Sequence, residues 1–345
     1  MQIFFQGILQ SDFWKSTQTS SEASDLEMVI VGTIAHDDIE TPSEKAKGIL
    51  GGSASHSGLA ASFHLRPPPG HPPRIGIVSV VGQDFSTYHQ MVLEDAGLNL
   101  AGVALREGET PRRYLKYDSE MARIGLPITE TNVLDGFSPF LPQAWTSPEV
   151  LLCADSNPSI QLEALNQSSG SRINALDTSK TWIEEEFVHL SKAMRLSDIV
   201  ILDEDEANLI SGERVLTQSI SSIISGESLH GGIAAGKGPR SLIVKRGSSG
   251  VLANLPCGTI ALPAYPMENP IDPTGFGDTF AGALFSSLVG HESPLNDVEV
   301  MRKSIVHASV SASYCSEGIG TKGVRTLGRG KYHARADRYR RIVGI

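Results

Sequence analysis

The stretch Arg74-Ile-Gly-Ile-Val-Ser-Val-Val-Gly82 is a short apolar run that ends in glycine, as expected of a buried β-strand. Runs of the same kind recur along the chain, and stretches suited to helices separate them. They are Met28–Gly32, Val150–Ala154, Ile173–Asp177, Ile199–Leu202 and Leu242–Lys245. Apolar strands that alternate with helices predict an α/β protein, in which a mainly parallel sheet is covered on both faces.

The composition narrows the class of protein further. The 345 residues are 40 % hydrophobic and carry a formal net charge of −10, which is typical of a globular protein and argues against nucleic acid as a partner. No apolar run is long enough to cross a membrane, so we expect no membrane partner. Three widely spaced cysteines without metal-ligand spacing favour reduced thiols and a cytoplasmic protein.

The chain is expected to hold one large domain over residues 28–345, preceded by a flexible extension over residues 1–27. The extension lacks the pattern of a signal peptide. Within the domain, one clear helix is predicted over Trp182–Leu196, with acidic residues early and basic residues late.

Two polar segments, at about residues 35–50 and 104–126, interrupt the strand and helix pattern. The alternation in Arg113-Tyr-Leu-Lys-Tyr117 indicates an exposed strand. The two segments could meet as a small β lid at one edge of the sheet, or they could be unrelated surface loops. A lid with exposed strand edges would also offer a surface for a homodimer.

The chemistry is concentrated in Asp272-Pro-Thr-Gly-Phe-Gly-Asp278-Thr-Phe-Ala-Gly282. The residues after Asp278 have a helical apolar face, so the glycines precede or open a helix. The N–H groups of residues 275–278 can therefore converge on a phosphate-sized anion. Asp278 could be a simple N-cap, or it could take a proton from an attacking alcohol during phosphoryl transfer.

Two glycine patterns only partly match known nucleotide-binding motifs. Gly275-Phe-Gly277 could begin a dinucleotide fingerprint, but the third glycine of that pattern is replaced by Phe280. The segment Gly231–Lys237 nearly matches a Walker A loop, yet Gly238 stands where Ser or Thr would bind magnesium. This segment also precedes a strand instead of following one, so we interpret it as a loop.

Three motifs together resemble the pfkB/ribokinase family of carbohydrate kinases, from about Met28 to the end of the chain. Asp272–Asp278 is similar to the C-terminal signature of the family. Gly51-Gly-Ser-Ala-Ser-His56 resembles its double-glycine motif, and Gly32-Thr-Ile-Ala-His-Asp37 resembles the end of its first strand. The resemblance implies a ribokinase-like three-layer sandwich with a mainly parallel central sheet and a small β lid.

The resemblance also implies roles for individual residues. The catalytic group would be Asp278 as base, with an anion hole formed by Gly275, Phe276 and Gly277. Substrate hydroxyls would be bound by Asp37, Gly51, Gly52 and His56. ATP would be bound by Lys245, Gly247 and His307. Asp203 and Glu206 would hold Mg²⁺ through water, and Asp272 and Thr274 could shape a site for K⁺.

Two of these positions depart from the family pattern. Asp203 and His56 each stand where the family has Asn. Asp203 adds negative charge near ATP, and His56 offers one donor and one acceptor from a differently shaped ring. An unusual acceptor, such as a nucleoside or a modified sugar, would fit the second change.

The sequence therefore predicts an ATP-dependent kinase that phosphorylates the hydroxymethyl group of a sugar. A nucleoside kinase of the same family is the first alternative. A non-catalytic sensor of sugar or nucleotide is an alternative of another class, although a sensor has no need of a base at Asp278. A dehydrogenase is less well supported, because the dinucleotide fingerprint is incomplete.

Overall fold

A computed structural model describes residues 26–125, 128–268 and 270–345, so most of the predicted extension over residues 1–27 lies outside the described residues. The two residues of that segment that are described belong to the folded domain. Leu26 is buried in the core, and Glu27 forms an ion pair with Arg74.

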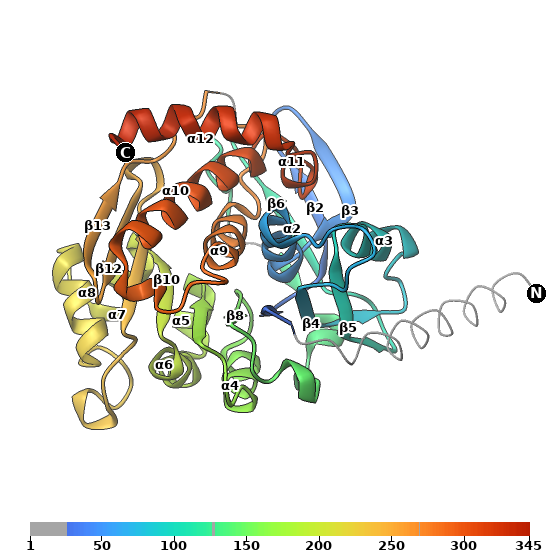
Figure 1. Ribbon diagram of the computed structural model, residues 1–345. Coiled ribbons are helices and arrows are strands. Elements are labelled where there is room, and N and C mark those ends of the chain that lie inside the picture. The colour runs from blue at the N-terminus through green and yellow to red at the C-terminus, as the bar shows by residue number, and fades with distance from the viewer. Residues whose placement is uncertain (1–25, 126–127, 269) are drawn as a thin grey trace, which may run out of the picture.

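A large, mostly parallel sheet forms the centre of the molecule (Figure 1). Adjacent strands of this sheet run parallel from β5 through to β11. β12 runs antiparallel to β11, and β13 runs antiparallel to β12. In spatial order the strands are β13 (Gly258–Leu262), β12 (Val251–Leu255), β11 (Ser241–Lys245), β10 (Ile199–Asp203), β9 (Ile173–Asp177), β8 (Val150–Cys153), β1 (Met28–Val31), β4 (Ile75–Gly82) and β5 (Leu98–Arg106). The prediction of an α/β fold with a mainly parallel sheet is confirmed.

Helices cover both faces of this sheet, which makes the three layers visible in Figure 1. The alternation within β1 shows why: Met28 and Ile30 pack into one hydrophobic core, and Val29 and Val31 pack into the other. The first core is covered by α2 (Ser53–Leu65), α3 (Thr87–Asp95), α9 (Phe276–Ser286), α10 (Val298–Cys315), α11 (Lys322–Arg325) and α12 (Arg329–Val343). The second is covered by α4 (Pro158–Gln167), α5 (Lys180–Glu185), α6 (Phe187–Leu196), α7 (Glu204–Ser211) and α8 (Leu216–Ser225).

A second, smaller sheet lies beside the first. In spatial order it comprises β3 (Lys45–Gly51), β2 (Ala35–Glu40), β6 (Arg112–Lys116) and β7 (Ile128–Glu130). The two polar segments therefore do meet, with β2 and β6 paired in parallel. Their extent differs from the expectation, because residues up to Arg106 belong to β5 of the large sheet and because β7 lies beyond residue 126.

The helix predicted over Trp182–Leu196 is divided in two. Glu186 has φ −131° and ψ 33°, outside the helical region, and separates α5 from α6. Its carboxylate instead contacts Nδ1 of His189 at 2.8 Å, across the first turn of α6. The helix is thus interrupted at a single residue, which the charge pattern alone did not reveal.

The Walker-like segment is a loop before β11, and it presents carbonyl groups, not N–H groups, to a charged partner. Arg195 donates to the carbonyl oxygens of His230 at 3.2 Å, Gly232 at 3.0 Å and Lys237 at 3.2 Å. A loop folded around a guanidinium is the reverse of a phosphate cradle. Among the described residues, no helix is both long and apolar enough to span a membrane.

Candidate active site

The glycine-rich segment opens helix α9, as the sequence predicts. Gly275 is the N-cap and has φ +76°, a conformation that side chains with a Cβ rarely adopt. Asp278 lies in the first turn of α9 and is partly exposed. The N–H groups at this helix start have no partner within the helix, so they and the helix dipole favour a bound anion.

Helix α2, which follows the double-glycine motif, is held tightly against this helix start. A Cβ on Gly282 would lie 2.1 Å from the carbonyl oxygen of Ser57, so only glycine permits the approach of the two helices. The Ser57 hydroxyl donates to the backbone oxygen of Asp278 at 3.0 Å. A Cβ on Gly275 would lie 2.1 Å from Nδ1 of His56. The helix with the expected acceptor residues and the helix with the expected base therefore form one unit.

His56 is completely buried under Gly275. Neither ring nitrogen has a hydrogen-bond partner among the described residues, and burial lowers the pKa of the ring to about 4. The ring is therefore neutral at pH 7, with one donor and one acceptor unused.

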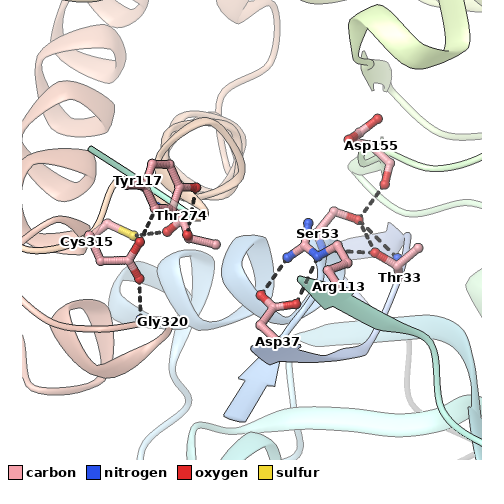
Figure 2. Close-up of polar contacts among 10 residues, drawn as sticks. Thr33, Asp37, Ser53, Arg113, Tyr117, Asp155, Thr274, Cys315 and Gly320 are labelled. Carbon is pink, nitrogen blue, oxygen red and sulfur yellow. Dashed lines mark hydrogen bonds and ion pairs between the residues drawn. The ribbon is translucent and has the colours of Figure 1, made fainter. Parts of the chain in front are cut away.

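An ion pair with a buried carboxylate closes the side where the acceptor is expected (Figure 2). Asp37 of β2 and Arg113 of β6 are direct neighbours in the parallel register. Arg113 donates from Nε to Oδ1 of Asp37 at 2.9 Å and from Nη2 to Oδ2 at 2.8 Å. Gly51 packs on the same carboxylate, because a Cβ there would lie 2.0 Å from Oδ2. Asp37 is 0 % exposed as a result, so an acceptor can reach its carboxylate only if Arg113 moves.

Charged residues from four neighbouring strands gather on the side where the nucleotide is expected, because parallel strands end at the same edge of a sheet. Asp177, Asp203 and Lys245 end β9, β10 and β11, and Asp155 follows β8. The ammonium of Lys245 lies 3.4 Å from Oδ1 of Asp203 and 3.9 Å from Oδ1 of Asp177. A Cβ on Gly277 would lie 2.8 Å from the same ammonium, which places Lys245 at the start of α9.

Three carboxylates here, those of Asp155, Asp177 and Asp278, bind protons more tightly than usual. Burial, together with the charge of Asp155, raises the pKa of Asp278 to about 6. Burial and the charge of Asp177 raise the pKa of Asp155 to about 6, and burial raises that of Asp177 to about 7. Burial alone would lower the pKa of Lys245, but the surrounding carboxylates, Asp177 first, raise it above its ordinary value. Asp278 is thus mainly ionised at pH 7 and close to the pKa that suits a general base.

The two residues expected near magnesium differ in their surroundings. The side chain of Asp203 is 57 % exposed. Glu206 is buried, and its Oε2 accepts the backbone N–H of Asp203 at 2.7 Å, which caps α7. Among the described residues, no group of three or more His, Cys, Asp or Glu side chains could hold a metal ion. One or two carboxylates near phosphates fit Mg²⁺, which usually keeps several waters and takes phosphate oxygens as ligands.

The residues expected at a monovalent cation are engaged within the protein. Asp272 is buried, and its two oxygens accept N–H groups of Thr274 at 2.9 Å and Gly320 at 2.6 Å. The Thr274 hydroxyl hydrogen-bonds to the Tyr117 hydroxyl at 2.9 Å, and the Cys315 thiol donates to the Thr274 carbonyl at 3.2 Å (Figure 2). This network joins the segment after β6, the segment before α9 and the end of α10.

The two remaining residues expected to bind the nucleotide lie in different surroundings. Gly247 lies two residues after Lys245, the last residue of β11, and has φ +52°. His307 of α10 is only 5 % exposed and packs against His64 and Tyr332. Its hydrogen bond and ring contacts are to residues of α2 and α12, and none of them is to Lys245, Gly247 or the start of α9.

Four residues of the site were missed in the sequence. Asp155 and Asp177 follow buried strands, so the rule that polar residues gather at the carboxyl ends of parallel strands could have found them. Ser57 lies beside the double-glycine motif but has no distinguishing pattern. Arg113 appears as one of several charges on an exposed strand, and only the pairing of β6 with β2 reveals its partner.

Comparison with known proteins gives a match to one protein family and to a curated relative. The model of the pfkB family of carbohydrate kinases matches residues 73–298. A cytidine kinase of Thermococcus kodakarensis is 27 % identical over an alignment of 271 residues, and the match covers 76 % of this chain and 88 % of that kinase.

Two solved structures show the same fold at low sequence identity. The ribokinase of Giardia lamblia superposes with a TM-score of 0.70 at 18 % identity, over 92 % of this chain and 100 % of that chain. A fructokinase double mutant of Vibrio cholerae O395, in its fructose-, ADP- and potassium-bound form, gives a TM-score of 0.69 at 18 % identity, over 91 % of this chain and 99 % of that chain. The predictions of a ribokinase-like fold and of family resemblance are thereby confirmed.

Proposed function

Because this chain belongs to the pfkB family of carbohydrate kinases and is a phosphotransferase that acts on a hydroxyl group, we propose that it transfers the γ-phosphate of ATP to a hydroxymethyl group of a sugar. The observation that carries the proposal is the position of Asp278. Its carboxylate lies in the first turn of α9, beside the N–H groups of the glycine-rich start and near the Lys245 ammonium. A base, an anion site and a cation are the parts that phosphoryl transfer requires.

In the proposed reaction, Asp278 accepts the proton of the acceptor hydroxyl while the hydroxyl oxygen forms a bond to the γ-phosphorus. The bond between that phosphorus and the β,γ-bridging oxygen breaks, and ADP leaves with the electron pair. The N–H groups of Gly275, Phe276 and Gly277 stabilise charge on the transferring group. Helix α2 fixes the base, because Ser57 holds the backbone of Asp278 at 3.0 Å.

On the nucleotide side, we assign ATP to Lys245 and Gly247, with Lys245 facing the phosphates. Asp203 and Glu206 would hold a magnesium ion, mostly through water. Magnesium, when bound, would neutralise charge on the β- and γ-phosphates. The role proposed for His307 at the adenine has the weakest support, because its contacts are to α2 and α12.

On the acceptor side, we assign hydroxyl binding to Asp37, Gly51, Gly52 and His56. The unused nitrogens of His56 support this role, since a buried polar atom normally has a partner. Arg113 must be added to the group, because it covers Asp37.

A nucleoside is the second candidate acceptor. The similarity to a cytidine kinase over 76 % of this chain favours it, and so does His56 in place of the Asn usual in the family. In that case the reacting group is the hydroxymethyl of the ribose, and the chemistry at Asp278 is unchanged.

Three further assignments remain proposals. Thiol groups at all three cysteines, none of which forms a disulfide, support a cytoplasmic protein. The outer strands β3 and β7 of the small sheet offer edges for a homodimer. K⁺ is assigned to Asp272 and Thr274, and a potassium-bound form of the similar fructokinase supports use of the ion in general. Both side chains are already hydrogen-bonded, and no step above depends on the ion.

The test is ADP release from magnesium ATP across pentoses, hexoses and nucleosides, with Asp278→Asn as the control. Turnover on one class of acceptor, lost in the variant, would establish the function and identify the acceptor class. No turnover on any of them, with ATP still bound, would contradict the proposal of a sugar or nucleoside kinase.

A further inference from the structure

A basic groove lies away from the catalytic residues, where α2, α3 and α11 are neighbours (Figure 1). Its main cavity has a volume of about 540 Å³, and an adjoining cavity of about 460 Å³ shares two of its residues. We define the basic groove by the residues of these walls that carry its charge and its aromatic surface. They are Phe63, Arg66, Tyr88, Lys322, Arg325 and Arg329.

The guanidinium groups of the groove are held by neutral groups. Arg329 donates to the carbonyl oxygen of Phe63 at 2.9 Å and lies 4.8 Å from the centre of that ring. Arg325 donates to the Tyr88 hydroxyl at 3.3 Å and lies 5.9 Å from the centre of that ring. Arg66 donates to the backbone oxygen of Asp95. These contacts fix the positions of the cations without neutralising them.

The charge of the groove is opposite to that of the chain. The whole protein carries a formal net charge of −10, yet Asp95 is the single acidic residue in either cavity wall. None of the four cations of the groove forms an ion pair with an acidic side chain in the described parts of the chain. Arginine presents a planar fork of donors that suits phosphate, and the two rings offer an apolar surface beside it.

We propose that the basic groove is a second ligand site, which binds a small phosphorylated metabolite with an aromatic or apolar portion. The phosphate would lie between the arginines, and the apolar portion would lie against Tyr88 and Phe63. This site does not depend on the catalytic proposal, because none of its residues belongs to the active site.

The groove nevertheless shares structure with the active site. Ile319 and Thr321 line the adjoining cavity and flank Gly320, whose N–H donates to Asp272 at 2.6 Å. Helix α2 contributes Phe63 to the groove, and Arg66 is its C-cap residue, while its first turns hold His56 and Ser57 against α9. A bound ligand would therefore contact two elements that position the base.

The test uses phenyl phosphate as the probe and inorganic phosphate and phenol as its two fragments. Binding to the full chain is measured by calorimetry with magnesium ADP at saturation, which fills the catalytic anion site. We expect phenyl phosphate to bind at least tenfold more tightly than either fragment. Arg325→Glu with Arg329→Glu should weaken it at least tenfold, whereas Arg341→Glu, an exposed change elsewhere on α12, should leave it unchanged.

Equal loss in the Arg341→Glu control, or binding of phenyl phosphate no tighter than that of phenol, would overturn the proposal. If the double charge reversal does not fold, Arg325→Gln with Arg329→Gln removes the charge without reversing it, and thermal unfolding verifies the fold. Failure of the initial ADP titration would count against the proposed kinase function instead, so the two proposals fail separately.

Discussion

The side proposed for the acceptor and the side proposed for the nucleotide each place a partly buried cation beside carboxylates, but in different ways. On the acceptor side, Arg113 holds Asp37 by two hydrogen bonds of 2.9 and 2.8 Å. On the proposed nucleotide side, the ammonium of Lys245 lies 3.4 Å from Oδ1 of Asp203 and 3.9 Å from Oδ1 of Asp177. These distances allow electrostatic attraction but are longer than the hydrogen bonds of Arg113. The comparison indicates that the first pair is held more firmly than the second. An acceptor must therefore displace Arg113 to reach Asp37, while the second cation is available to a phosphate that displaces its weak partners.

The largest expected effect is on the base that both regions face. Asp278→Asn should lower kcat by about 10²- to 10⁴-fold, because the amide cannot accept the hydroxyl proton. ATP affinity and acceptor affinity should both change little, since neither Arg113 nor Lys245 is altered. Steady-state kinetics and ATP binding by calorimetry check this, and wild-type turnover in the variant would remove Asp278 as the base.

Arg113→Met should break the first pair and leave a fully buried carboxylate without its partner. Breaking a buried pair in this way costs about 3–5 kcal/mol of unfolding free energy. The acceptor KM should rise while the ATP KM stays nearly constant. Chemical denaturation and steady-state kinetics measure the two effects.

Arg112→Met is the matched control for that change. Arg112 is the neighbouring residue of the same strand, and its ion pair with Asp38 at 2.9 Å is partly exposed. Its loss should cost no more than about 1 kcal/mol. Equal losses of stability in the two variants would show that the Arg113 pair has no special structural weight.

Lys245→Met should affect the other side. The ATP KM should rise about 10- to 100-fold, the equivalent of about 1.5–3 kcal/mol for a hydrogen bond to a charged group. The acceptor KM should stay nearly constant. Stability should fall much less than with Arg113→Met, because Asp177, with a pKa of about 7, can be protonated when Lys245 is lost. A rise in the acceptor KM as large as that in the ATP KM would show that Lys245 does not act on ATP binding alone.

The smallest expected effect concerns pH. A base with a pKa of about 6 is active when ionised, so kcat/KM should fall about tenfold per pH unit below pH 6. Asp155→Asn removes a negative charge that raises the pKa of Asp278, and should move this fall to lower pH by less than about one unit. A shift to higher pH, in kcat/KM profiles of the two proteins, would mean that Asp155 does not act on the base through its charge.

The fold was largely predictable because it follows from local patterns. Apolar runs such as Arg74–Gly82 are buried on both faces of the sheet, and their alternation with helices fixes the layers. The break at Glu186 was not predictable, since it is confined to the dihedral angles of one residue within a segment of continuous helical pattern. The limits of the small sheet were missed at Arg106 because polar residues occur both in β5 and in the segment that follows it.

The candidate site was predictable where one short segment contains the chemistry. Gly275 and Asp278 are three residues apart, so the helix start could be recognised directly. Arg113 and Asp37 are far apart in the chain, and only the register of β6 on β2 brings them together. The surroundings of His307 likewise depend on α2 and α12, which no local pattern places.

The contact of Gly282 with Ser57 has a consequence for the interpretation of sequence variants. Replacing Gly282 by alanine adds a single methyl group and no charge, and a substitution table would rank it as mild. That methyl group would meet a carbonyl oxygen at 2.1 Å, and α2 and α9 would have to move apart. Such an allele would be damaging although every reacting atom is intact, so a variant at this position should be judged by backbone clearance and not by chemical resemblance.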